Sequence, residues 1–180
     1  MNAKTLSVLK KIAIALLLIA VFANMIYIAV GITGRTLGTL DFINAIILSL
    51  TLIFAAYYLI SGCTKDLSAS FFKCFMNVFA LEQLICLAGH SSYDSVSVIL
   101  IALTFGALTV LSVAKDLGEK LSKKLGWVVV FCTVCRFIPA AVTGQIASGW
   151  IGIASIIFLA LCCQLMVCAK YQDKKERGRA

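Results

Sequence analysis

The feature that most constrains this chain is a series of long apolar segments, each about twenty residues, separated by short polar ones. A run of about 18 or more residues with few charges is typical of a transmembrane helix, because about 20 residues at ~1.5 Å each cross a ~30 Å hydrocarbon core. Only 13% of the residues are charged, against about 25% in an average soluble domain. The sequence therefore predicts a single all-α integral membrane domain over 1–180, with transmembrane helices at about 12–32, 42–61, 71–89, 96–114, 126–144 and 150–169.

Basic residues indicate how these six spans are oriented. If the N-terminus faces the cytoplasm, 14 of the 16 Lys and Arg residues lie in cytoplasmic segments, Arg35 lies in an outer loop and Arg136 lies within a span. Cytoplasmic loops retain Lys and Arg, so both ends are predicted to lie inside, with 170–180 as a basic cytoplasmic tail. Because the loops are short, the spans should form three antiparallel hairpins. The fourteen are Lys4, Lys10, Lys11, Lys65, Lys73, Lys115, Lys120, Lys123, Lys124, Lys170, Lys174, Lys175, Arg177 and Arg179.

The net charge of +8 is thus explained by topology, and it also favours contact with anionic lipid headgroups. No nucleic-acid partner is predicted. The N-terminus resembles a signal peptide, since Lys10 and Lys11 precede an apolar run with a small-residue site near Ala23. The run continues to Ile32, longer than the apolar region of a usual signal peptide, so we predict an uncleaved first span.

The eight cysteines are predicted to be reduced thiols that pack as small apolar residues. Five of them lie well within predicted spans, Cys63, Cys74 and Cys168 lie near the inner ends of spans, and none falls in an outer loop, where an oxidising compartment would preserve a disulfide. Cys132 and Cys135 form a CxxC pair, which in soluble proteins is a redox or metal motif. Here the pair lacks a second pair of ligands, so no metal and no cofactor are predicted.

Two charged residues are predicted to lie near the membrane midplane. Glu82 is about 16 Å into the third span, and Arg136 is about 15 Å into the fifth, which runs in the same direction. An isolated charge at this depth costs about 2.5–3.5 kcal/mol on insertion scales. We therefore expect Glu82 and Arg136 either to form an ion pair or to line one polar cavity.

Further polar residues, and the only proline, surround this predicted site. Asn24 reaches a similar depth in the first span, and Asn77 and Gln83 lie on the third, so these three are candidate ligand contacts beside Glu82 and Arg136. Pro139 lacks an N–H group and should bend the fifth helix, freeing a backbone carbonyl next to the guanidinium. Broken helices at the midplane are a recurring feature of transporter sites.

Two functions are compatible with this pattern. The first is a membrane protein that binds or transports a small solute or ion at the midplane site. The second is a structural or regulatory membrane subunit, in a homo-oligomer or with a membrane partner, in which the charged pair only holds helices together. No catalytic signature nominates an enzyme. Lysine-rich inner loops and reduced cysteines favour the plasma membrane of a bacterium.

Overall fold

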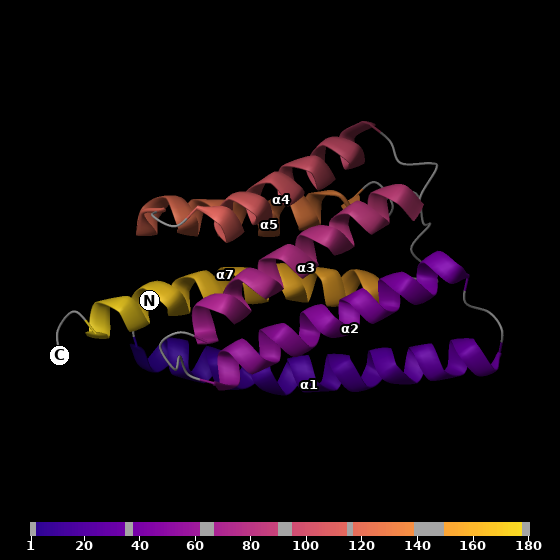
Figure 1. The fold of residues 1–180 in the computed structure, drawn as a ribbon, viewed down its shortest axis with the longest axis horizontal. Coiled ribbons are helices and arrows are strands. Elements are labelled where there is room, and N and C mark those ends of the chain that lie inside the picture. The colour runs from indigo at the N-terminus through magenta and orange to yellow at the C-terminus, as the bar shows by residue number, and fades with distance from the viewer. Residues whose placement is uncertain are drawn as a thin grey trace.

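The computed structural model describes residues 3–34, 38–61, 67–89, 95–114, 117–138 and 150–177, and every regular element in this part of the chain is a helix, as predicted (Figure 1). The helices are α1 (Ala3–Thr33), α2 (Thr39–Ile60), α3 (Leu67–Gly89), α4 (Ser95–Val113), α5 (Glu119–Cys135) and α7 (Trp150–Arg177).

The helices pack side by side in a closed ring. Each of them contacts the next in the order α1, α2, α3, α4, α5, α7, and α7 closes the ring by contacting both α2 and α1. Successive helices run in opposite directions, so α1 begins and α7 ends at the same end of the bundle, at the left of Figure 1. In this ring α4 separates α3 from α5, so any contact between those two must cross the interior.

Among the described residues, four helices are long and apolar enough to cross a membrane: Thr5–Thr33, Phe42–Ile60, Ser95–Val113 and Ile153–Gln172. They correspond to the first, second, fourth and sixth predicted spans. The third predicted span coincides with α3, whose side chains are described over 70–85. The fifth, 126–144, begins within α5 and continues into residues 139–149, which lie outside the described part. Six spans therefore stay a prediction.

Helix ends differ from the predicted span limits because charged residues continue the helices beyond the apolar segments. Helix α5 begins at Glu119, seven residues before the predicted start of its span. Lys and Glu are good helix formers, and Glu119 accepts a hydrogen bond from Lys123 one turn later. That hydrogen bond raises the pKa of Lys123. Its ammonium group therefore stays charged at the polar end of the bundle, where α5 begins.

The interior of the ring is filled mainly by α2, α3 and α7. Leu52, Phe75, Phe79 and Leu159 are completely buried there. Among the side chains that the structure describes, α3 contributes five of the twelve largest fully buried ones, and two of these five are the polar Glu82 and Gln83. These two polar side chains therefore lie beside a packed apolar core.

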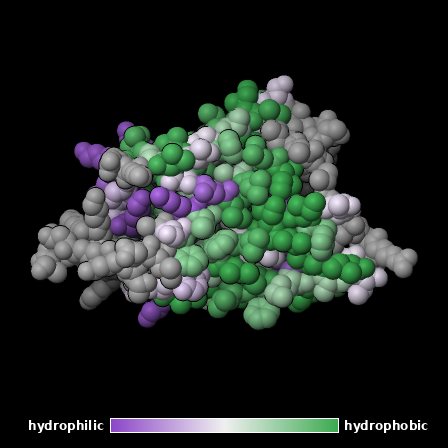
Figure 2. Space-filling view, viewed as in Figure 1, coloured by the Kyte–Doolittle hydropathy of each residue, from purple (hydrophilic) through white to green (hydrophobic). Residues whose placement is uncertain are grey.

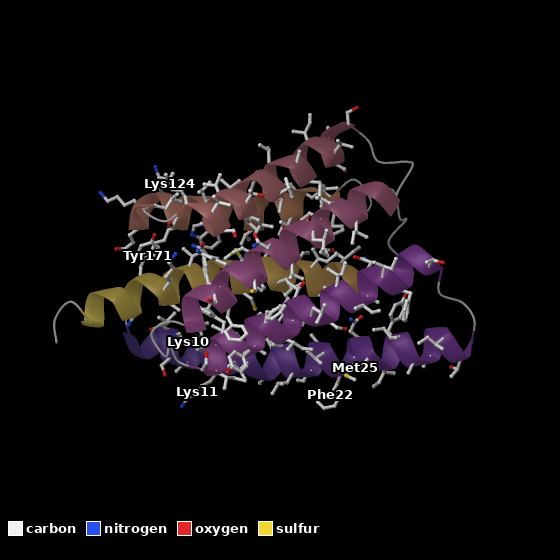
Figure 3. All side chains as sticks on the ribbon, in the orientation of Figure 1. Lys10, Lys11, Phe22, Met25, Lys124 and Tyr171 are labelled. Carbon is white, nitrogen blue, oxygen red and sulfur yellow. The ribbon has the colours of Figure 1, made fainter. Side chains whose placement is uncertain are left out.

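The outer surface of the bundle is strongly apolar. Only 17% of the most apolar stretch of α1 is buried, and Phe22 and Met25 point away from the other helices (Figure 3). Hydrophobic residues cover the centre and right of the face in Figure 2, while hydrophilic ones gather at the left. An apolar surface of this extent is unsuited to water and is compatible with direct contact with lipid.

The polar end carries lysines from helices that are far apart in the sequence. Lys10 and Lys11 of α1 and Lys124 of α5 lie at the end where α1 begins and α7 ends (Figure 3). Tyr171 ties α7 to α5 there, because its hydroxyl donates to the Leu117 carbonyl and lies 2.7 Å from Ser122 Oγ. The basic residues thus collect at one end of a tied bundle, an arrangement that suits a surface of anionic headgroups.

Candidate functional site

The candidate site is a buried cluster of three polar side chains, two of which come from α3. Glu82 and Gln83 are consecutive residues of this helix, and both are completely buried. Adjacent helical residues project about 100° apart. Because α3 packs against both α2 and α4, a large part of its circumference is covered by protein. The side chains of Glu82 and Gln83 are therefore both buried although they project in different directions.

The third member, Arg136, lies where α5 ends. Helix α5 closes at Cys135, and the N–H of Phe137 bonds the carbonyl of Val134, which tightens the last turn to an i→i−3 hydrogen bond. The Arg136 side chain is only 5% exposed, and its guanidinium lies 4.5 Å from the centre of the Phe137 ring. The predicted bend at Pro139 lies outside the described residues, but the described helix ends four positions before it.

Gln83 connects the two charged residues. Arg136 Nη1 donates to Gln83 Oε1 at 2.6 Å, and Gln83 Nε2 in turn donates to Glu82 Oε2. We call this arrangement the Glu82–Gln83–Arg136 relay. A glutamine amide has both a donor and an acceptor, so it can face a carboxylate at one end and a guanidinium at the other. The relay crosses the interior between α3 and α5, which are not neighbours in the ring.

The relay leaves part of the guanidinium unsatisfied. Within the described residues, Arg136 Nε is buried and has no hydrogen-bond partner, and the same holds for Thr133 Oγ1, one turn earlier on α5. Other helical threonines bond their own helix: Thr51 Oγ1 lies 2.7 Å from the carbonyl of Ile47, and Thr104 Oγ1 lies 2.8 Å from that of Leu100. An unmet buried polar group costs about 1–3 kcal/mol, so two on adjacent turns require an explanation.

The other two predicted ligand contacts lie elsewhere and join neighbouring helices. Asn24 Nδ2 donates to the Ala45 carbonyl at 2.9 Å and to Ser49 Oγ at 2.8 Å, which fastens α1 to α2. Asn77 Oδ1 accepts a 2.6 Å hydrogen bond from Ser112, which fastens α3 to α4. Of the five predicted residues, the described contacts therefore bring together Glu82, Gln83 and Arg136, and they place Asn24 and Asn77 at separate helix pairs.

We expect Asn24→Ala to lower the thermal stability of the full chain in detergent. Side-chain hydrogen bonds between membrane helices contribute about 0.6 kcal/mol on average and up to ~1.7, which corresponds to a few degrees for a chain of this size. Ser49→Ala is the control, since Asn24 keeps its bond to Ala45 and the loss should be smaller. An unchanged melting temperature for Asn24→Ala would show that this amide does not hold α1 to α2.

Cysteine chemistry gains no support from the described structure. Cys132, Cys162 and Cys163 are buried free thiols, and Cys163 Sγ lies 3.6 Å from Met76 Sδ in the core. In the part of the chain with described side chains, no three His, Cys, Asp or Glu residues are placed to hold a metal ion. Cys163 therefore packs against Met76 in the core, and Cys132 and Cys162 are buried like it.

The sequence did not indicate two of the unsatisfied polar groups found here, those of Thr133 and of Gln164, whose buried Oε1 also has no described partner. Gln83 was a candidate ligand contact, but its place between Glu82 and Arg136 was not predicted. Thr133 could have been found, because it lies three residues before Arg136 and so shares its side of the helix.

No family model, curated protein or solved structure matches this chain. The fold and the site alone define the class. The part of the chain that the structure describes is all-helical, has four helices able to cross a membrane, and has a buried polar relay between α3 and the end of α5.

Proposed function

We propose that this chain is an integral membrane protein that binds or transports a small solute at the Glu82–Gln83–Arg136 relay. The observation that carries the proposal is the buried guanidinium of Arg136, which has one edge bonded to Gln83 and an Nε donor without a described partner. Ionisable residues within membrane spans commonly mark substrate or ion pathways. A bound solute with an acceptor atom would satisfy this buried Nε donor, and so would explain why the protein leaves it without a partner of its own.

The topology that goes with this proposal is six spans in three hairpins with both termini in the cytoplasm, in the plasma membrane of a bacterium. The antiparallel order of the helices supports it, as does the gathering of Lys10, Lys11 and Lys124 at the end where α1 begins. Lipid would cover the exposed outer face of α1.

The alternative function is a structural or regulatory membrane subunit, partnered by a second copy or another membrane protein. One observation favours it: the relay already joins both charges through hydrogen bonds, and all three side chains are at least 95% buried. A relay of this kind could serve only to hold α3 against the end of α5. The two functions differ in whether water and solutes ever reach Arg136.

Access can be measured with Thr133→Cys and the anionic reagent sulfonatoethyl methanethiosulfonate. The full chain is treated in native vesicles, and the modified thiols are identified by peptide mass spectrometry. A solute pathway opens the site transiently, so Cys introduced at 133 should be modified within the incubation. Cys163, fully buried against Met76, is the internal control and should stay unmodified. Protection of both thiols until the protein is denatured would contradict the proposal and favour the structural subunit.

A further inference from the structure

The unsatisfied edge of Arg136 restricts which solutes could bind. Nη1, the nitrogen bonded to Gln83, lies next to the side-chain Cδ, whereas the Nε–H points along the opposite edge, parallel to one N–H of Nη2. Two parallel N–H groups match the two oxygens of a carboxylate, which is the usual bidentate geometry of Arg with such groups. The free Nε therefore belongs to a fork and is not an isolated donor.

The chemistry of the unmet groups also excludes several solute classes. A guanidinium has donors only, so cations and solutes without acceptor atoms cannot satisfy Nε. The hydroxyl of Thr133 can donate to the same acceptor, since Thr133 lies one turn before Arg136 and, unlike Thr51 and Thr104, is not bonded to its own helix in the described contacts. A planar group with several acceptor atoms would satisfy both if it lay between them.

The surroundings of the guanidinium favour approach along this edge. The Phe137 ring lies against the Arg136 guanidinium, whose Cζ is 4.5 Å from the centre of the ring. Glu82 lies behind Gln83, so the neutral amide stands between the carboxylate of Glu82 and the guanidinium. In the described contacts the guanidinium therefore bonds a neutral amide and no carboxylate, so a carboxylate at its free edge would be its first direct ionic partner.

We propose that the solute of this site carries a carboxylate, which binds the Nε/Nη2 edge of Arg136 with the Thr133 hydroxyl as an additional donor. This inference rests on the proposed function and specifies its solute class. The carboxylate could belong to a water-soluble acid or to a fatty acid that enters from the bilayer. The chemistry of recognition is the same in both cases.

The test uses thermal unfolding of the purified full chain in detergent, with sodium benzoate and sodium decanoate as probes and sodium chloride at equal ionic strength as the reference. A ligand that binds the folded state raises the melting temperature as its concentration exceeds Kd. We expect benzoate, or decanoate alone if the source is the bilayer, to raise it well beyond chloride. Equal curves in all three salts overturn the proposal.

Two variants assign the effect to the fork. Arg136→Lys keeps the positive charge but loses the parallel N–H pair, and it should weaken carboxylate binding at least tenfold. Thr133→Val keeps the side-chain shape and should weaken binding several-fold, which provides a second measurement if Arg136→Lys does not fold. A carboxylate-dependent shift that survives unchanged in both variants overturns the proposal. Modification of Thr133→Cys without any carboxylate effect would leave the solute site standing and reject only this solute class.

Discussion

Replacement of Gln83 by methionine is expected to lower the stability of the bundle by about 3 kcal/mol, near the lower end of the range for a buried charge deprived of its partner. Methionine is unbranched and similar in length, so the packing around α3 should be retained. What is lost is the amide that accepts from Arg136 and donates to Glu82. Arg136 would remain buried without its described acceptor, and Glu82 would lose the amide that donates to it. The expected decrease in melting temperature is about 6–12 °C, measured by circular dichroism in detergent.

Gln164→Met is the matched control for Gln83→Met. Gln164 is also a buried helical glutamine, at 8% exposure, but its Oε1 has no described hydrogen-bond partner. Removing an unsatisfied acceptor relieves a desolvation cost, so this variant should be as stable as the wild type or slightly more stable. Equal destabilisation by the two substitutions would mean that the cost lies in packing, and that the relay contributes nothing measurable to stability.

The helices themselves could be predicted because the membrane signal is strong and local. Long apolar segments separated by short polar ones predicted an all-α chain, and four of the predicted spans coincide with helices able to cross a membrane. The ends were less predictable. Helix α5 begins at Glu119, before its apolar segment, and the hydrogen bond between Lys123 and Glu119 stabilises these first turns. A hydropathy pattern does not reveal such side-chain pairs.

The site could be predicted only in part. Charge and depth identified Glu82 and Arg136, but they did not identify Gln83 as the residue that joins them. Which polar side chain of α3 reaches α5 depends on the rotation of α3, and packing against α2 and α4 sets this rotation. The same dependence on helix rotation applies to Asn24, which bonds Ala45 and Ser49 of α2 instead of the relay.

Contacts between α5 and α7 show the limit of sequence reasoning most clearly. Gly126 is an ordinary glycine of a predicted span, and nothing in the sequence relates it to Gln164. In the structure, a Cβ atom built on Gly126 would lie 1.9 Å from Gln164 Oε1 and 3.1 Å from its Cδ. The end of the Gln164 side chain occupies the space beside residue 126 because glycine has no side chain, whereas the Gln164 Cα lies 3.6 Å from the built Cβ, an ordinary contact distance.

We therefore expect Gly126→Ala to destabilise the protein, by about 1–3 kcal/mol, the usual cost of extra volume in a packed interior. Gln164 must move its amide to make room, and it is itself buried at 8% exposure. The measurement is again the melting temperature of the full chain in detergent. The substitution adds one methyl group and no charge, so a large effect would come from the overlap with the Gln164 side chain.

Two comparisons decide whether the contact with Gln164 is the cause. Gly106→Ala in α4 is the matched control, because nothing lies within 4 Å of a Cβ there. It should leave stability unchanged or raise it by about 0.4–1 kcal/mol, since alanine restricts the unfolded chain more than glycine does. Gln164→Ala in the Gly126→Ala background removes the overlapping atoms and should recover much of the lost stability. If the double variant is no more stable than Gly126→Ala alone, the overlap with Gln164 is not what makes glycine necessary at position 126.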